Sequence, residues 1–435
     1  MPKQLRRRIL FFLIAIFLVL GTGVVLYAQG WRASFKPLGF GKVGAIYIRT
    51  FPADTALTLN GKPRQKKSGF FEKGGLLGDL LPGEYTVEAA AAGFQPWRRP
   101  VIVTSSLVAS LQNVVLIPLQ PIQVTSTPVR GITLAGPTLI LDTATGTRTL
   151  SGLPLPGNGI LAASEDGLMV VNYASGTRAY FLTDIARSTS TALTHLPGQA
   201  AAKTSWAFQP VRKDNTLFLV HGPNSLHLLR VPAGGAVTLS TSSVTAAASA
   251  PGRVVWSTFA TATDASFLSS YDIPSRNFNR GFEFVPGQIS LLSLGDAGAI
   301  FALATDGSLY SLNLNRSSRL RLAENVRSFV LSKDDDKLAV LDGQGARIFF
   351  LREDKLALQI PLPAAASIRR LTWYRDGMHL FVQYPDAVAF LDITDPKLDN
   401  FPLAAAAARA EYEPNDNALY FLKDGLLQKM VFAES

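Results

Sequence analysis

The stretch TWYRDGMHLFVQYPDAVAFLDI, residues 372–393, decides the fold, because its pattern repeats along most of the chain. An apolar approach leads to a polar turn at residues 375–377, an apolar run follows, and a second turn precedes another apolar run. Short apolar runs bounded by turn residues are typical of buried strands. The pattern recurs at intervals of roughly forty residues. Its seven copies begin at Leu161, Trp206, Ser249, Leu292, Phe329, Thr372 and Tyr412.

The first turn of the unit has a similar composition in six of the seven copies. It reads EDG, KDN, DAG, DDD, RDG or NDN at the same place in successive copies. Asp, Asn and Gly tolerate turn backbone angles, and Asp and Asn side chains hydrogen-bond their own main chain. Repeats of this length, each with several short strands, fit one β-propeller blade apiece. The sequence therefore predicts an all-β propeller over residues 121–435.

The repeats resemble those of the WD-type and Tol-type β-propellers in their order of polar turn, x-L-x-V strand, second turn and L-x-D. The last copy ends at Phe432 with no room for a fourth strand, and an open blade would expose a strand edge. We expect residues 132–150 to complete that blade by pairing with residues 412–432, which gives seven blades. If residues 132–150 instead form a blade of their own, the count becomes eight.

The N-terminus predicts a membrane segment. Lys3 and Arg6, Arg7 and Arg8 precede an uncharged apolar run from Ile9 to Ala28. A helix of about 20 apolar residues spans a bilayer core, and the basic flank stays on the cytoplasmic side. We expect residues 1–30 to form a single-pass signal-anchor in the cytoplasmic membrane, with residues 31–43 as a linker and the rest extracytoplasmic. A cleaved signal peptide is the alternative.

Residues 44–120 predict a small β-sandwich. AIYIRT and EYTVEAA alternate as strands do, and ALTLNGK enters an Asn60-Gly61 hairpin turn. This segment resembles the PEGA domain, a β-sandwich of bacterial and archaeal envelope proteins. The resemblance covers roughly residues 44–119 and rests on Thr50, Pro52, Ala56, Asn60, Gly61, Pro82, Gly83, Tyr85, Gly93, Phe94 and Trp97. The tetrapeptide that names the family is replaced by PADTA here.

The PEGA resemblance implies an envelope module without chemistry of its own. We interpret Tyr85, Phe94 and Trp97 as core residues, with an aromatic ligand platform as the alternative. A basic set is interpreted as a solvated face, with contact to acidic wall polymers or lipid headgroups as the alternative. That set is Lys66, Lys67, Arg98 and Arg99.

Composition and charge exclude several function classes. The chain has 435 residues, 47% of them hydrophobic, and no Cys, which excludes disulfides, thiolate metal sites and a Cys nucleophile. The net charge of +10 resides in residues 1–120, whereas residues 121–435 carry 27 basic and 27 acidic side chains. A neutral main domain argues against nucleic-acid binding, because that binding requires basic groups that neutralise phosphates.

Few residues offer catalytic or metal chemistry. His221 and His227 flank a turn and could face each other, but no cluster of further ligands stands near them; His195 and His379 are the other histidines. Residues 334–336 are three aspartates, yet they occupy the ordinary turn of the repeat without the spacing of a calcium loop. Trp206, Trp256 and Trp373 are expected to pack between blades. No catalytic, metal-binding or cofactor-binding residue is assigned, and no cofactor is expected.

We interpret the protein as a non-enzymatic envelope protein that displays a propeller for binding protein or glycan. An envelope glycan hydrolase or lyase and a structural surface-layer component are the alternatives. An enzyme should gather carboxylates, or a His-carboxylate pair, in the axial funnel, since propellers bring distant residues together there. A binder should show a hydrophobic or aromatic patch, and a surface-layer protein should oligomerise.

Overall fold

The computed structural model describes most of the chain and divides it into two compact units. The described residues are 3–28, 31–35, 38–65, 74–157, 159–175, 177, 179–193, 206–231, 235–296, 298–313, 318–353 and 357–433. The first unit comprises Met1–Gln120 with Phe432–Ser435, and the second comprises Pro121–Val431. Each unit is described by itself below.

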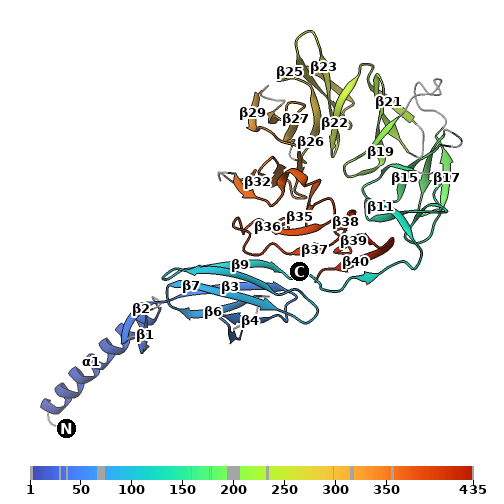
Figure 1. The fold of residues 1–435 in the computed structure, drawn as a ribbon. Helices are drawn as coiled ribbons and strands as arrows, with labels where there is room; N and C mark the ends of the chain where they lie inside the picture. Colours follow the sequence, from blue (N-terminus) through green and yellow to red (C-terminus); the bar gives the residue numbers. More distant parts are fainter. Residues whose placement is uncertain are drawn as a thin grey trace. The chain divides into compact units, whose positions relative to one another are not determined.

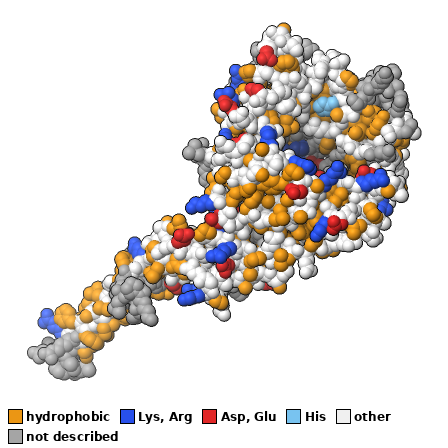
Figure 2. All heavy atoms as spheres, viewed as in Figure 1, with side chains coloured by type: hydrophobic (Ala, Val, Ile, Leu, Met, Phe, Trp, Pro, Cys, Tyr) orange, Lys and Arg blue, Asp and Glu red, His pale blue; other side chains and the backbone are white. Residues whose placement is uncertain are grey.

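The N-terminal helix α1, Lys3–Ala28, is long and apolar enough to cross a membrane. Its segment Ile9–Tyr27 has a mean hydropathy of 3.0, and none of it is buried in the protein. Figure 2 shows hydrophobic side chains exposed along the helix. An apolar helix that nothing covers suits a membrane anchor or a signal sequence.

Residues 31–43, expected to be a linker, contain a short hairpin. Strands β1 (Trp31–Phe35) and β2 (Leu38–Lys42) pair antiparallel. The register sets Trp31 opposite Lys42, and the Lys42 ammonium lies 5.7 Å from the centre of the Trp31 ring. The end of the hairpin therefore lies beside its beginning, and the next strand starts from there.

The first unit also contains a β-sandwich of two sheets. One sheet has the order β6-β3-β9, with β3 and β9 parallel, and the other has the order β5-β4-β7-β8. Their strands are β3 (Gly44–Phe51), β4 (Ala56–Leu59), β5 (Lys62–Arg64), β6 (Gly75–Leu80), β7 (Gly83–Ala90), β8 (Trp97–Val103) and β9 (Val108–Val115). The alternating residues of the strands face each other and form one core, which includes Ile46, Ile48, Val87 and Trp97.

The aromatic residues of the sandwich pack as expected for core residues. Trp97 is only 4% exposed, and Tyr85 and Phe94 pack partly buried against the same core. The Asn60-Gly61 turn has positive φ at both residues, and the Asn60 side-chain oxygen accepts a hydrogen bond from the Thr86 amide at 2.7 Å. In the basic set, Arg98 is exposed and pairs with Glu88, while Lys66 and Lys67 lie outside the described residues.

The second unit is a β-propeller. Its described residues form eight sheets that follow one another along the chain, all with antiparallel pairing (Figure 1). The first four are β11 (Val129–Ala135), β12 (Thr138–Thr143), β13 (Gly146–Thr149); β14 (Gly159–Ala163), β15 (Met169–Ala174), β16 (Ala179–Asp184), β17 (Thr189–Ala192); β18 (Ala207–Val211), β19 (Asp214–Gly222), β20 (Ser225–Arg230), β21 (Gly235–Ser240); and β22 (Val244–Ala250), β23 (Arg253–Ala260), β24 (Ala265–Asp272), β25 (Asn277–Pro286).

The other four sheets complete the unit. They are β26 (Ile289–Leu294), β27 (Ile300–Ala304), β28 (Leu309–Asn313), β29 (Ser318–Ala323); β30 (Ser328–Leu331), β31 (Lys337–Leu341), β32 (Gly345–Phe350), β33 (Leu358–Pro361); β34 (Arg370–Trp373), β35 (His379–Gln383), β36 (Val388–Asp392), β37 (Leu403–Ala405); and β38 (Ala410–Glu413), β39 (Ala418–Lys423), β40 (Leu426–Val431), β10 (Ile122–Gln123). A short 3-10 helix, Ala365–Ser367, lies between β33 and β34.

Buried side chains join each sheet of the second unit to the next. Trp206, Trp256 and Trp373 each lie in a cluster shared by two neighbouring sheets, as expected from the sequence. Tyr412 of β38 packs on Tyr374 beside β34, with ring centres 5.3 Å apart. The last sheet packs on β11–β12 through a cluster that includes Tyr420. The contacts thus return from the last sheet to the first, as a propeller requires.

The prediction for ring closure was wrong. Residues 132–150 do not pair with the last sheet, because β11, β12 and β13 pair with one another. The fourth strand of the last sheet is instead β10, whose Ile122 and Gln123 pair with Lys429 and Gln428 of β40. The Val124 amide continues this pairing with a hydrogen bond of 2.8 Å to the Leu427 carbonyl. The second unit therefore has one sheet more than the seven repeats.

Candidate functional site

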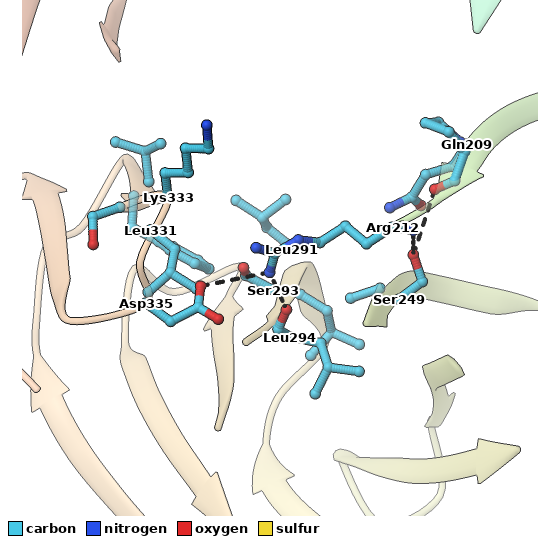
Figure 3. Close-up of a pocket in the computed structure, with 15 residues that line it drawn as sticks. Gln209, Arg212, Ser249, Leu291, Ser293, Leu294, Leu331, Lys333 and Asp335 are labelled. Atoms are coloured by element: carbon cyan, nitrogen blue, oxygen red, sulfur yellow. Dashed lines mark hydrogen bonds and ion pairs between the residues drawn. The ribbon is translucent and has the colours of Figure 1, made fainter. Parts of the chain in front are cut away.

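The second unit contains a cavity of about 480 Å³ between the first strands of four successive sheets. Strands β18, β22, β26 and β30, with the turns that follow β18 and β30, supply its lining (Figure 3). Each of these strands is the first of its sheet, and at least part of each lies in one of the copies that the repeat predicted. The repeat thus brings residues from four distant segments together.

Arg212 anchors the polar side of the cavity. Its backbone amide donates a hydrogen bond of 3.1 Å to the Ser249 hydroxyl of the next sheet. Its guanidinium donates to the Leu294 carbonyl at 3.1 Å and lies 3.4 Å from Asp296 and 3.5 Å from Asp335. One Arg side chain therefore joins three sheets across the cavity, as Figure 3 shows for its bonds to Leu294 and Asp335.

The acidic turn residues complete this network. The Asp335 carboxylate accepts a hydrogen bond of 2.5 Å from the Asp296 amide, and the Lys213 ammonium pairs with the Asp296 carboxylate. The Asp335 side chain is only 8% exposed. Asp296 and Asp335 therefore both face cations, and the charges within the network largely cancel.

The same turn positions make bonds between sheets elsewhere. Glu165 accepts a hydrogen bond of 2.5 Å from the Lys213 amide, and the Asn215 side chain accepts one of 3.2 Å from the Asp166 amide. From the sequence, turn geometry alone accounted for Asp, Asn and Gly at these positions. Positive φ at Lys213 and Asp335 agrees with that explanation, but their role in joining neighbouring sheets was missed.

The rest of the cavity lining combines apolar side chains with polar ones and one cation. Leu291 of β26 is 40% exposed, and Phe329 and Leu331 of β30 line the cavity beside it. Lys333 is exposed at the cavity, and among the described residues it has no ion pair. The cavity therefore presents an aliphatic and aromatic surface next to an available ammonium group. That combination can contact an apolar group and an acidic or polar group of a ligand together.

The three histidines within the described residues do not assemble a site. His221 pairs with Leu226 and His227 pairs with Val220, so the two imidazoles point to opposite faces of the sheet. The suggestion that they face each other was wrong, because one residue of register reverses the face. Burial lowers the pKa of both His221 and His227. His195 lies outside the described residues.

His379 forms a buried pair inside its own sheet. Its Nδ1 lies 2.8 Å from the Asp376 carboxylate, and its ring stacks on Phe390 with centres 4.7 Å apart. Burial lowers the pKa of His379, but the carboxylates of Asp376 and Asp392 outweigh it and raise the pKa overall. Because His379 is only 3% exposed, this pair is part of the core and does not face the cavity.

Asp334, Asp335 and Asp336 occupy an ordinary turn of the repeat. Asp336 accepts a hydrogen bond from Ser332 at 2.8 Å and pairs with Lys337, while Asp335 belongs to the network of Arg212. Burial raises the pKa of Asp336, but the bonds from Lys337 and Ser332 lower it more. Within the described ranges, no group of three or more His, Asp or Glu side chains could hold a metal ion.

No protein family and no curated protein matches the chain. A chain from the crystal structure of the mitotic checkpoint complex is similar, with a TM-score of 0.45 and 10% identity, over 63% of this chain and 88% of that chain. The propeller assignment rests on the sheet order and the packing between sheets described above.

Proposed function

We propose that the protein is a membrane-anchored envelope protein without enzymatic activity, whose propeller binds a protein segment or a glycan. In this proposal α1 stays attached as a single-pass anchor in the cytoplasmic membrane, and both folded units lie outside the cytoplasm. The sandwich is a PEGA-like spacer between the anchor and the propeller. The ligand binds at the cavity between β18, β22, β26 and β30.

The orientation is supported by the charges that flank α1. Lys3 and the three Arg residues at 6–8 precede the apolar segment, and no Asp or Glu occurs before residue 54. Basic residues next to a membrane helix remain on the cytoplasmic side. The apolar segment of 19 residues exceeds the usual length of about 7–15 residues for the core of a cleaved signal peptide. These features favour a retained anchor.

The observation that carries the binding proposal is the mixed lining of the cavity. Leu291, Phe329 and Leu331 offer an apolar surface in a concave site, and Lys333 adds a cation without an ion pair among the described residues. Binding sites are usually concave and largely apolar, with a few polar groups that fix orientation. This lining favours a protein segment with apolar and acidic side chains over a glycan.

The state of the ionisable groups supports a role in binding. Asp296 and Asp335 pair with Arg212 and Lys213, so neither faces the cavity as a lone carboxylate. The His379–Asp376 pair has the composition of a catalytic pair, but it is buried between aromatic rings of its own sheet. A general acid or base must reach the proton that it transfers.

Site-specific photocrosslinking tests the binding site. A photoreactive amino acid at Leu291, in the cavity, is compared with one at Leu320, which is 64% exposed on the outermost strand of the same sheet. We expect a discrete crosslinked partner in cells at position 291 and none at position 320. Lys333→Glu should reduce that crosslink, whereas equal crosslinking at both positions would contradict a site in the cavity.

A reporter fused after Ser435 tests the orientation independently. We expect activity of a reporter that requires export, and an intact N-terminus in the mature protein. Activity of a cytoplasmic reporter, or a mature chain that begins near Gln29, would contradict the anchored arrangement.

A further inference from the structure

One end of the sandwich collects strand termini from both sheets. Gly44, the first residue of β3, pairs with Leu80, the last residue of β6. Gly83, the first residue of β7, pairs with Val103, the last residue of β8. The turn from β8 to β9 closes the same end, because the Ala45 amide donates a hydrogen bond of 3.1 Å to the Leu107 carbonyl.

This end exposes four large apolar side chains, which we call the apolar rim. They are Leu81 at 41%, Ile102 at 72%, Leu107 at 60% and Val108 at 56% exposure. Their neighbours Leu80 and Val103 are buried in the core at 4% and 1%. Single exposed apolar residues are common on protein surfaces, but a group gathered at one end marks a contact surface.

The chain path places the apolar rim at the end of α1. The helix ends at Ala28, and the hairpin that follows returns to its start because Trp31 pairs with Lys42. Strand β3 begins at Gly44, two residues after Lys42, which is at most about 7 Å along an extended chain. A Cβ added to Gly41 would lie 3.8 Å from Leu81 Cδ2, so the hairpin lies next to the rim.

We propose that the apolar rim inserts into the membrane interface on the side where α1 emerges, and that its partner is the lipid bilayer itself. The proposal rests on α1 being a retained membrane anchor. Apolar side chains on a folded surface enter the boundary between headgroups and acyl chains, and aromatic residues prefer that boundary. Trp31, which has Lys42 over its ring, begins the hairpin that lies between α1 and β3.

The contact depends on apolar insertion more than on charge. Glu84 pairs directly with Ile102 in the sheet, and Asp79 lies close to the end of β6. The exposed Arg98 lies near the beginning of β8, toward the opposite end of the sandwich. Because the rim lacks a basic cluster among the described residues, its contact with lipid is expected to resist salt, unlike binding to acidic headgroups.

The absence of Cys from the sequence makes a direct test possible. The full chain, as Leu107→Cys labelled with an environment-sensitive fluorophore, is reconstituted into phosphatidylcholine vesicles with and without lipids that carry a quencher near the headgroup. Leu119→Cys is the matched control, because Leu119 is 54% exposed and its amide bonds the Gly93 carbonyl at the other end of the sandwich. Ile102→Cys provides a second position in the rim.

We expect the labels at 107 and 102 to shift to shorter wavelength and to be quenched by the lipid, with little change at 119. The quenching should persist in high salt. A chain that floats with the vesicles while all three labels remain unquenched would overturn the contact and leave the anchor intact. A chain that does not float with the vesicles would overturn the anchor, and with it this inference.

Discussion

The sandwich and the propeller organise their cores in different ways. The sandwich holds one cluster of buried side chains between its two sheets, and strands from residues 44–115 complete it. The propeller divides its buried side chains among several clusters, each shared by neighbouring sheets. A sheet of the propeller therefore depends on both neighbours, and the ring depends on the pairing of β10 with β40. A destabilising change in the sandwich should therefore affect the sandwich alone, whereas one in the propeller should destabilise neighbouring sheets as well.

The largest expected effect comes from deleting residues 410–435. The deletion removes β38–β40, which include the partner of β10, and three of the seven buried residues in the cluster that contains Ile132 and Tyr420. It exposes the faces and edges of the remaining neighbours, which favours unfolding or association of the whole propeller. We expect hydrogen exchange measured by mass spectrometry to lose protection throughout residues 121–409, beyond the last sheet alone.

Residues 44–115 serve as the internal control in the same experiment. Their protection should change little, because the core cluster of the sandwich contains no residue after Leu116, and only Phe432–Ser435 of the deleted residues belong to the first unit. Retained protection in residues 160–350 of the truncated chain would show that the sheets are stable without closure. That result would remove the difference between the two units.

The second prediction concerns Trp97, which anchors the core of the sandwich. Trp97→Ala should reduce the free energy of unfolding of the sandwich by about 3–5 kcal/mol, because it leaves a large cavity in a single core. Exchange protection should fall in residues 44–115 and remain in residues 121–431. Tyr85→Phe is the control, since it removes a single exposed hydrogen bond to the Leu81 carbonyl and should have a small effect. A loss of protection in both units would contradict independent cores.

The sequence predicted the repeated units well because their signal is strong and local. Each copy has two apolar runs, six of the seven copies have Asp in the first turn, and the three Trp residues at 206, 256 and 373 pack as expected. Strand β10 could not be found in this way, since two paired residues, Ile122 and Gln123, carry no periodicity. Residues 132–150 lack the polar turn of the other copies, although Gly136 and Gly146 supply positive φ at their two turns.

The cavity could not be predicted, because its contacts join residues far apart in the sequence. Lys213 and Asp296 are 83 residues apart, and only the curvature of the ring brings them together. The turn motif indicated where Asp296 and Asp335 would lie within their own sheets, but not which cation each would meet. The positions of His221 and His227 depended on a single residue of register, which a turn of uncertain length does not fix.

The third prediction tests whether the network at the cavity joins neighbouring sheets. Arg212→Ala should destabilise the propeller by about 1–3 kcal/mol, because it removes a charged donor and leaves the largely buried Asp335 carboxylate without a cation. Arg212→Lys should recover part of the loss, since it keeps the charge but not the fork of donors. Thermal unfolding followed by circular dichroism measures both, and equal stability of Arg212→Ala and the wild type would contradict the role of the network.

The smallest effect is expected for Asp376→Asn, and it should depend on pH. The pKa of His379 is raised overall because Asp376 and Asp392 outweigh burial, so the charged imidazole stabilises the fold. A raised pKa contributes stability that is fully present below the unfolded value of about 6.5 and is lost as the pH rises through the folded pKa. Asn at position 376 keeps the oxygen that accepts hydrogen bonds from the Met378 and His379 amides, but it lacks the charge. Asp376→Asn should therefore lower the melting temperature more at pH 5 than at pH 8, whereas Asp376→Ala should lower it at both values. Equal losses for Asp376→Asn at the two pH values would show that His379 stays neutral in the folded propeller.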